Sequence, residues 1–513
     1  MSGGECQDAV FAFLADPATH GGRAVKRIDT HAASVFLVGE RALKVKRAVR
    51  FPFLDYSTVA RRKSACEAEL QINRSFAPGI YRRVLAITRE ADGRLTLDGS
   101  GTPVEWALEM RRFDENATLD RLAERGMIDA ALADALGRAV ASLHAAAEPV
   151  DFEPWITALA DYIEHNDAAF RERPDLFPPA EAETLTEPSR AGHARLRPLL
   201  VERGGRGLIR RLHGDLHLGN IVLLGGRPAP FDAIEFSSLV ASGDVLYDLA
   251  FLLMDLVERG LKPAANVVLN RYLVETKRIE DLDALATLPL FLSIRAAIRA
   301  KVTAARLAYA ASDQTTGIAH SARTYFQFAR RCVEPAPPRL LAIGGLSGTG
   351  KSALAYALAA ELAPDPGAVV LRSDVERKTL FGKDEYERLP QAAYSPAVTA
   401  RIYATITDKA RRAVAAGHSA IIDAVFATRH ERAAAVASAE VLGVPFCGLF
   451  LDADLETRLA RIGGRGRNAS DADAAVARRQ ESYDLGDLDW TRIDASGAPE
   501  ETLARARSAI GQC

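Results

Sequence analysis

The segment GLSGTGKS, residues 345–352, has the spacing G-x-x-x-x-G-K-[ST] and lies between a strand-like run, LLAIG, and a helical pattern, ALAYALAAELA. Glycines allow successive backbone N–H groups to surround phosphate oxygens, and the N-terminus of the following helix attracts anions. Lys351 can reach the β- and γ-phosphates of a nucleotide, and the Ser352 hydroxyl can bind Mg²⁺. The alternative is a glycine-rich turn that binds nothing. The motif predicts a Walker A loop made of Gly345, Ser347, Gly348, Thr349, Gly350, Lys351 and Ser352.

Acidic and basic side chains follow the next two strand-like runs. Asp374 and Arg377 stand one helical turn apart after GAVVLRS, and Asp423 ends SAIID. In a doubly wound sheet these positions lie at the carboxyl edge, where sites form. We predict that Asp374 deprotonates an acceptor hydroxyl and that Arg377 holds an anionic substrate group, while Asp423 helps to hold Mg²⁺. Alternatively, Asp374 caps a helix, Arg377 faces solvent and Asp423 is an ordinary strand-end residue.

Arginines gather around two glycines in RLARIGGRGRNASDADAAV, at Arg458, Arg461, Arg465 and Arg467. A hinged segment of this kind can close guanidinium groups over a γ-phosphate, where they stabilise charge and exclude water. We therefore predict an arginine lid in which Arg461 and Arg465 act in catalysis. A solvated helical face is the alternative.

A second set of chemical residues stands in RLHGDLHLGNIVLLGGRPAPFDAIEF. Asp215 lies in a loop between apolar runs and can accept the proton of an attacking hydroxyl. Asn220 and Asp232 have the residue types that share a Mg²⁺ on the phosphates of ATP, and a hairpin through the G-G-R-P turn would bring them together. His213 is expected to brace the loop. Two roles stay open for His217: contact with phosphate and support of the loop backbone.

The segment H-G-D-L-H-L-G-N resembles the catalytic loop of protein kinases, and this resemblance implies an upstream lysine and a helical glutamate that hold the α- and β-phosphates of the same ATP. Lys44, in the strand ALKVKRAV, is the first choice, and Lys46 on the same strand face is its rival. In the following helix, Glu69 fits the spacing of the apolar residues that hold the helix against the sheet better than Glu67 does. VEWALEMRRF should lead to a hinge where backbone near Met110 meets adenine, unless it is a plain core strand.

These residues need two kinds of scaffold. Before about residue 113, β-type runs surround one helix, and from about 114 to 331 helical patterns dominate. Three prolines in CVEPAPPR indicate a linker at 332–339. Residues 340–513 alternate strand and helix patterns, which is typical of a doubly wound parallel sheet. The sequence thus predicts an α+β, two-lobed domain at 1–331 and an α/β domain at 340–513.

Composition limits the partners and the compartment. The 513 residues, with 48% hydrophobic side chains, allow two or three folded domains. The 65 basic and 67 acidic side chains nearly balance, so the net charge does not attract nucleic acid or an anionic membrane. Nucleic acid stays open as a partner of the second domain only. No signal peptide and no apolar run of about 18 to 20 residues is visible. Five scattered cysteines suggest reduced thiols. We predict a cytoplasmic chain.

Both motif sets resemble known kinases. H-G-D-L-H-L-G-N and FDAIEF resemble the protein-kinase-like aminoglycoside phosphotransferase and choline-kinase families over about residues 25–330, which implies that Asp248 in GDVLYDLA braces the catalytic loop. The segment DTHAASVFLVG lacks the glycine-rich loop of protein kinases, and His31 and Ser34 are the candidates there for phosphate contacts. Residues 339–513 resemble the P-loop kinases that include the zeta-toxin, gluconate-kinase and polynucleotide-kinase families.

The resemblance covers the whole chain, which is similar to bacterial fusions of these two domain types. It implies an ATP- and Mg²⁺-dependent phosphotransferase with two kinase sites, each acting on the hydroxyl of a small-molecule acceptor. The alternative is a regulatory switch, in which one or both domains bind ATP to control the other domain or a partner. Both domains would use ATP and Mg²⁺ as cofactors.

Overall fold

The computed structural model describes residues 3–51, 54–464, 466 and 468–511. Two arginines of the predicted lid, Arg465 and Arg467, lie outside these residues. The chain forms two compact units, which we call unit 1 (Met1–Leu159 with Leu200–Leu252) and unit 2 (Ala160–Leu199 with Leu253–Cys513). Among the described residues, no helix is long and apolar enough to cross a membrane.

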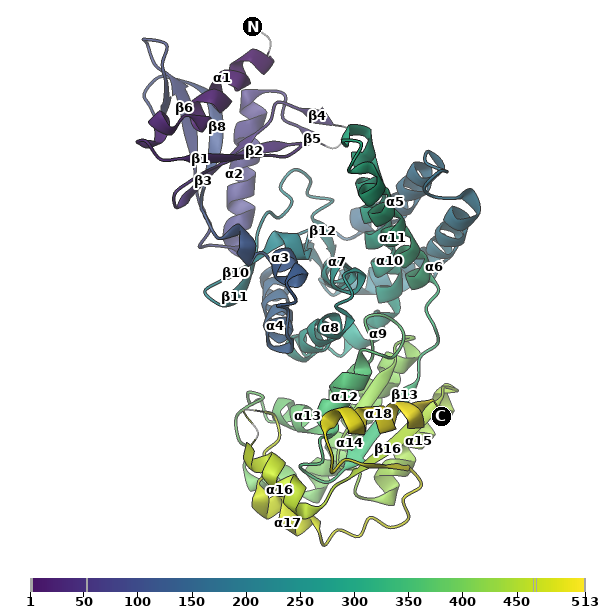
Figure 1. The fold of residues 1–513 in the computed structure, drawn as a ribbon. Coiled ribbons are helices and arrows are strands. Elements are labelled where there is room, and N and C mark those ends of the chain that lie inside the picture. The colour runs from purple at the N-terminus through teal and green to yellow at the C-terminus, as the bar shows by residue number, and fades with distance from the viewer. Residues whose placement is uncertain (1–2, 52–53, 465, 467, 512–513) are drawn as a thin grey trace. The chain divides into compact units, whose positions relative to one another are not determined.

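Unit 1 begins with a six-stranded antiparallel sheet in the order β1-β2-β3-β8-β6-β7 (Figure 1). Alternating apolar side chains, among them Phe36, Leu43, Val45 and Ile87, form its core. Helix α2 packs on β8 and β6, so residues on its inner face approach the central strands. The elements are α1 (Gly3–Ala15), β1 (Val25–Asp29), β2 (Ala33–Val38), β3 (Arg41–Lys46), β4 (Arg50–Phe51), β5 (Leu54–Asp55), α2 (Val59–Phe76), β6 (Tyr81–Arg89), β7 (Leu95–Leu97) and β8 (Thr102–Arg111).

The rest of unit 1 is mainly helical, with two short antiparallel strand pairs around the loop of Asp215. Strands β10 and β11 pair antiparallel, which confirms the predicted hairpin, and Asn220 and Asp232 flank its two ends. The elements are α3 (Leu119–Glu124), α4 (Ala130–Ala146), β9 (Ile209–Arg211), β10 (Ile221–Leu224), β11 (Arg227–Pro230) and β12 (Ser242–Asp244). Helices α5 (Glu153–Arg171), α6 (Pro179–Gly205) and α7 (Val245–Glu258) each belong partly to unit 1 and partly to unit 2.

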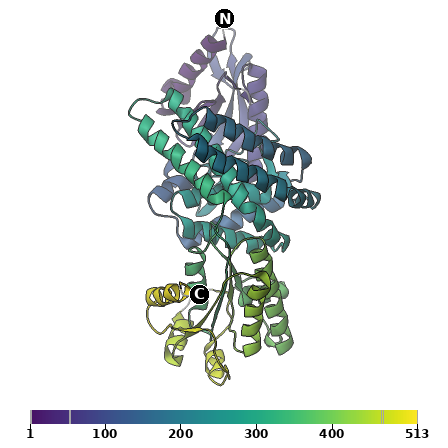
Figure 2. The same cartoon turned by 90° about the vertical axis from the view of Figure 1, so that its right-hand side faces the viewer.

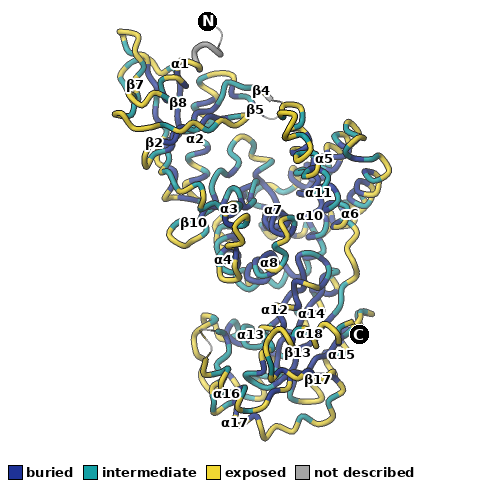
Figure 3. The backbone as a smooth tube through the Cα atoms, viewed as in Figure 1, coloured by how far each residue is buried: buried dark blue, intermediate teal, exposed yellow. Residues whose placement is uncertain are grey.

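Helices also form the first part of unit 2. Helices α10 and α11 pack along each other, and Phe170, Phe177 and Phe326 stack in a buried aromatic cluster. Most residues of α10 are buried, as the tube view of Figure 3 shows. The elements are α8 (Lys262–Thr276), α9 (Glu280–Asp283), α10 (Leu288–Ala305) and α11 (Thr315–Val333).

A five-stranded parallel sheet in the order β14-β15-β13-β16-β17 completes unit 2. Figure 2 shows α14 and α15 on one side of this sheet and α18 on the other, as in a doubly wound fold. The strands are β13 (Leu340–Gly345), β14 (Val369–Arg372), β15 (Ala420–Asp423), β16 (Phe446–Asp452) and β17 (Thr491–Asp494). The helices are α12 (Lys351–Ala359), α13 (Ser373–Leu380), α14 (Pro396–Ala415), α15 (Arg429–Leu442), α16 (Leu455–Gly464), α17 (Ala474–Gln480) and α18 (Pro499–Ile510). The predicted fold class is confirmed for both parts of the chain.

Two other expectations have different outcomes. Residues 334–339, inside the predicted linker, form neither helix nor strand, but the two compact units divide elsewhere, so the domain boundary at 331 stays a prediction. Cys66 and Cys332 are buried free thiols, whereas Cys447 is disulfide-bonded. The expectation of reduced thiols throughout is therefore wrong for Cys447.

The stability of unit 2 should depend on His418, which precedes β15. Its ring is fully buried and donates from Nε2 to Gly367 O at 2.7 Å. Burial lowers the pKa of His418 to about 4. Because the unfolded chain takes up this proton near pH 6.5 and the folded chain does not, stability is complete above that pH and is lost as the pH falls towards 4. Urea unfolding should show a loss of about 1.4 kcal/mol per pH unit across this window from this residue.

The His418→Gln variant should lack this part of the pH dependence. The matched control is His430→Gln, since His430 is exposed at the start of α15. An unchanged slope in His418→Gln, or an equal change in His430→Gln, would contradict the assignment.

Candidate active sites

The loop around Asp215 follows β9 in unit 1. The side chain of Asn220 donates from Nδ2 to Asp215 Oδ2 at 2.9 Å and to the Asp215 carbonyl at 3.0 Å. His217 Nδ1 accepts from Gly219 N at 3.1 Å, and its Nε2 lies 3.5 Å from Asp215 Oδ2. The predicted base and the predicted metal ligand therefore lie side by side, and His217 gives the loop backbone support.

Lys44 joins two residues that are distant in the sequence. Its Nζ lies 2.8 Å from Glu69 Oε1 and 2.5 Å from Asp232 Oδ1. Burial would lower the pKa of Lys44, but the charges of Asp232 and Glu69 raise it well above its ordinary value. Burial would likewise raise the pKa of Asp232, and the Lys44 charge holds it below its ordinary value. The ammonium and the carboxylate are thus both charged, as ligands of phosphate and metal must be.

Lys46, the rival of Lys44, has a different environment. It lies 2.5 Å from the second oxygen of Glu69, and it also pairs with Glu235, which accepts a hydrogen bond from the Tyr56 hydroxyl at 2.6 Å. Both lysines therefore hold the fully buried Glu69, and only Lys44 of the two pairs with Asp232. The geometry favours Lys44 as the phosphate ligand and Lys46 as a support.

Two of the alternatives in the first lobe can be placed. Glu67 lies 3.6 Å from Lys63 on the same helix and is largely exposed, so the structure places Glu69 at the lysines. Met110 pairs with Ala42 and Tyr81 on its two sides, within the sheet. The meeting of adenine with backbone near Met110 stays a prediction.

Buried hydrogen bonds brace the catalytic loop. His213 donates from Nε2 to Phe231 O at 2.9 Å, and burial lowers the pKa of His213, so its ring is neutral. Gly214 N donates to Asp248 Oδ1 at 3.0 Å, and His144 Nε2 lies 3.2 Å from Asp248 Oδ2. This agrees with the bracing roles expected for His213 and Asp248.

The ion pair of Arg203 with Asp244 fixes the chain next to this loop. The two side chains are 2% and 0% exposed, and two guanidinium nitrogens lie 2.6 and 2.8 Å from the carboxylate oxygens. Removal of one partner leaves the other charge buried. Arg203→Ala should therefore lower the free energy of unfolding of unit 1 by about 3 to 5 kcal/mol in urea titrations.

The matched control is Arg206→Ala, directly after the end of α6, because Arg206 forms an exposed pair with Glu202 at 2.8 Å. An exposed pair of this spacing contributes only about 0.3 to 0.5 kcal/mol. Equal losses in the two variants would contradict the role given to burial.

The glycine-rich loop of unit 2 has the backbone of an anion cradle. Gly345, Gly348 and Gly350 have φ of 139°, 91° and 94°, which other residues rarely adopt. A Cβ atom on Gly348 would lie 2.7 Å from the Arg458 carbonyl oxygen. Within the described chain, the N–H groups of Gly348 and Gly350 donate to no protein acceptor. Such open N–H groups before a helix fit the phosphates of a nucleotide.

Lys351 and Ser352 begin α12 beside this cradle. Lys351 Nζ donates to Leu346 O at 3.0 Å, and burial lowers the pKa of Lys351 although Asp423 and Asp374 oppose the shift. The Ser352 hydroxyl donates to Asp423 Oδ2 at 2.5 Å, and Arg372 Nε lies 3.3 Å from the same oxygen. The two predicted Mg²⁺ ligands are therefore in contact.

Asp374 and Arg377 lie on α13, next to the same strand ends. Burial raises the pKa of Asp374, and the Asp423 charge adds to the shift while Arg372 opposes it. Arg377 is 6% exposed, donates to Ala393 O at 2.6 Å and lies under the ring of Tyr394 at 4.8 Å. Its Nε has no hydrogen-bond partner among the described residues. Arg377 is thus a buried residue with a spare donor, and it does not face solvent.

The arginines of the arginine-rich segment contact different parts of the second unit. Arg458 is buried and donates to Ser347 O at 2.9 Å and to Ala477 O at 3.0 Å, so it supports the phosphate loop. Arg461 donates to Gly497 O at 2.8 Å and lies 3.4 Å from Thr349 O. Gln480 Oε1 of α17 accepts from Ser347 N at 2.7 Å. The lid segment thus contacts the loop through Arg458, Arg461 and Gln480.

Sequence reasoning missed several of these residues. Tyr56, Arg372 and Gln480 stand in no motif, and Glu235 stands in FDAIEF without a role assigned to it; each matters because of a partner far away in the chain. Of these residues, only Glu235 had a sequence signal that could have pointed to a role, because it is an acidic residue in the otherwise apolar segment AIEF. Among the described residues, no group of three or more His, Cys, Asp or Glu side chains could hold a metal ion. Both donor sets instead suit Mg²⁺ that keeps phosphate and water ligands.

The two parts of the chain match two family models. Residues 59–286 match the model described as a phosphotransferase enzyme family, and residues 340–483 match the model described as an AAA domain. With the folds above, these matches define a fusion of a kinase-like phosphotransferase domain with a P-loop kinase-like domain.

Curated relatives are similar over almost the whole chain. Uncharacterized proteins of Mycobacterium tuberculosis and Mycobacterium bovis are each 30% identical over 501 residues, which covers 94% of this chain and 95% of theirs. The chain therefore belongs to the family of these mycobacterial proteins.

Solved structures are similar to each part separately. A choline/ethanolamine kinase family protein from Mesorhizobium loti is 17% identical, with 64% of this chain and 99% of that chain covered and a TM-score of 0.36. A gluconokinase from Sinorhizobium meliloti is 20% identical, with 34% and 95% covered and a TM-score of 0.24. The APS kinase CysC of Mycobacterium tuberculosis is 21% identical, with 34% and 98% covered and a TM-score of 0.27.

Proposed function

We propose that this protein is an ATP- and Mg²⁺-dependent phosphotransferase with two kinase sites, each of which transfers the γ-phosphoryl group of ATP to a hydroxyl of a small-molecule acceptor. The observation that carries the proposal is the contact of Lys44 with both Glu69 and Asp232, beside a loop in which Asn220 holds Asp215. A lysine between a helical glutamate and a metal-binding aspartate is the arrangement that positions ATP phosphates.

In the first site, each residue has a separate task. Lys44 neutralises the α- and β-phosphates, Glu69 fixes Lys44, and Asn220 and Asp232 would hold Mg²⁺. Asp215 orients the acceptor hydroxyl and takes up its proton as the oxygen attacks. The metal supplies charge neutralisation on the phosphates when bound.

In the second site, the cradle N–H groups and Lys351 hold the phosphates, and Ser352 and Asp423 would hold Mg²⁺. Asp374 takes up the acceptor proton, and its raised pKa makes it a better base than an exposed carboxylate. The spare Nε donor of Arg377 fits an anionic group on the acceptor. Arg461 and Arg465 are proposed to add positive charge over the γ-phosphate when the lid closes.

The test is ATP consumption by the full chain with a library of small hydroxyl compounds, followed by mass spectrometry of metabolite pools for the gain of one phosphoryl group. We expect Asp215→Asn and Asp374→Asn each to remove a different activity. Undiminished turnover in both variants would contradict both base assignments.

The regulatory switch is the second candidate, because helix α8 of the first family match packs with the P-loop part in unit 2. A switch predicts tight ATP binding by one or both parts without transfer to any compound. Transfer that depends on Asp215 would exclude a purely regulatory first domain.

A further inference from the structure

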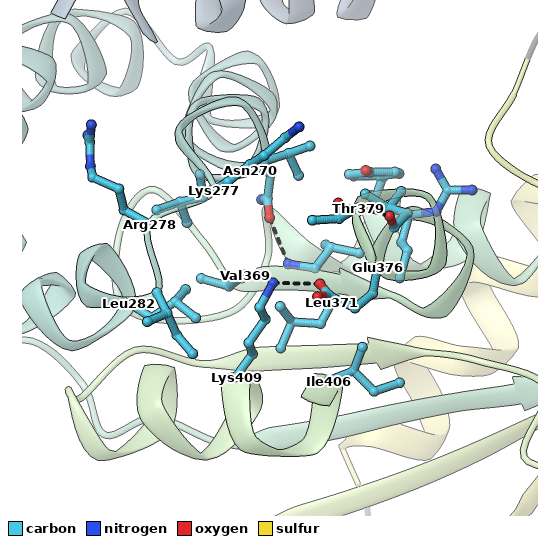
Figure 4. A pocket seen from close by; sticks show the side chains of 17 residues that line it. Asn270, Lys277, Arg278, Leu282, Val369, Leu371, Glu376, Thr379, Ile406 and Lys409 are labelled. Atoms are coloured by element: carbon cyan, nitrogen blue, oxygen red, sulfur yellow. Dashed lines mark hydrogen bonds and ion pairs between the residues drawn. The ribbon is translucent and has the colours of Figure 1, made fainter. Parts of the chain in front are cut away.

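Helix α8 is attached to the edge strand of the parallel sheet by two asparagines. Asn270 Oδ1 accepts from Val370 N at 2.7 Å, as the close-up of Figure 4 shows, and its Nδ2 donates to Ala368 O at 3.1 Å. Asn266 Nδ2 donates to the same carbonyl at 3.0 Å. Both asparagines are buried, so they satisfy the strand edge in place of a further strand. The position of α8 on β14 is therefore well defined.

The residue after Asn270 begins a row of alternating charges that ends in the nucleotide site. Arg271 lies 2.6 Å from Glu385, Glu385 lies 3.7 Å from Arg372, and Arg372 lies 3.3 Å from Asp423. Their side chains are 9%, 11%, 10% and 5% exposed in that order. The last carboxylate accepts from the Ser352 hydroxyl. Since water screens such buried charges little, each pairing affects the next.

We propose that Arg271 is a positioning residue of the P-loop site: it holds Glu385 and so keeps Arg372 on Asp423, which sets how strongly that site binds Mg²⁺. This inference rests on the proposed function of the second domain. Arg271 lies within residues 59–286, which match the phosphotransferase model, so one family segment contributes to the site of the other.

The direction of the effect follows from competition at one oxygen atom. Arg372 Nε and the Ser352 hydroxyl both contact Asp423 Oδ2, where Mg²⁺ with its water would also bind. Without Arg271, the carboxylate of Glu385, which lies 3.7 Å from Arg372, draws that arginine away from Asp423. Mg²⁺ then binds more tightly. Without Glu385, Arg372 stays on Asp423 and Mg²⁺ binds more weakly.

Arg271 lies closer to Glu385 than to an acidic residue of its own helix. Its second acidic neighbour, Glu275 at 3.5 Å, lies on the same helix and is 32% exposed. The pocket of Figure 4, beside α8 and β14, has a volume of about 60 Å³, which has room for only a few water molecules. A nucleotide does not fit in this pocket, and Arg271 does not line it.

The experiment titrates Mg²⁺ into the full chain with a fluorescent, non-hydrolysable ATP analogue. Asp232→Asn serves as the background, because it removes a proposed metal ligand of the first site. We expect Arg271→Gln to lower the half-saturating Mg²⁺ concentration about threefold to tenfold and Glu385→Gln to raise it by a similar factor. The double variant should match Glu385→Gln alone, because Arg271 acts through Glu385. Arg271→Lys, which keeps the charge, should stay close to the parent.

The matched control is Lys262→Gln. Lys262 is also a cation of α8, and it pairs with Asp365 at 2.8 Å, away from the row. Shifts in the same direction for Arg271→Gln and Glu385→Gln, additive effects in the double variant, or an equal shift in Lys262→Gln would overturn the inference while the proposed function stands. If the parent shows no Mg²⁺-dependent nucleotide binding that Ser352→Ala removes, the proposed function of the second site fails as well.

Discussion

Replacement of Asp215 by asparagine will lower kcat of the first phosphoryl transfer about a hundredfold to ten-thousandfold and leave KM for ATP nearly unchanged. Asparagine keeps the shape of the side chain and cannot take up the proton of the acceptor hydroxyl. The ATP phosphates are held elsewhere, by Lys44 and its partners. The measurement is initial-rate kinetics with the acceptor found in the compound screen, together with ATP binding by calorimetry.

The control for Asp215→Asn is Asp134→Asn, which neutralises an aspartate that pairs with Arg138 at 2.9 Å on α4. It should keep the parent rate. A rise in KM for ATP with unchanged kcat in Asp215→Asn would mean that Asp215 binds nucleotide and does not act as the base.

Replacement of Lys351 by methionine will remove most of the second activity, with a fall in kcat/KM of about a hundredfold to a thousandfold. Methionine keeps the length of the buried side chain and loses its charge, so the phosphates lose their closest cation in the cradle. Because burial already lowers the pKa of Lys351, the neutral side chain costs the fold little. The variant should unfold at nearly the parent temperature and should leave the activity that depends on Asp215 intact.

The control here is Lys383→Met, since Lys383 is exposed and pairs with Glu387 one turn away. Loss of both activities in Lys351→Met would contradict two independent sites and would favour the regulatory switch. Parent-level nucleotide binding would contradict the phosphate role of the lysine.

Much of each site follows from contiguous motifs. The positive φ values of the glycine loop and the β10–β11 hairpin depend on residues only a few positions apart. Local backbone preferences decide such features, so the sequence predicts them. Arg377 was less well predicted, because a helical arginine after a strand can face solvent or the interior. Packing against Tyr394 and the loop before α14 decided its burial.

By itself, the amino-acid sequence determined the two fold classes and the residues that we propose as phosphate ligands, because anion cradles and catalytic loops are short segments with fixed spacing. Only the tertiary structure decided between Lys44 and Lys46, since the choice depends on Asp232, 188 positions away. It also placed Arg271 next to Glu385, which lies 114 positions later in the sequence. No local pattern specifies such pairs, because packing of whole helices and sheets sets which buried charges must neutralise one another.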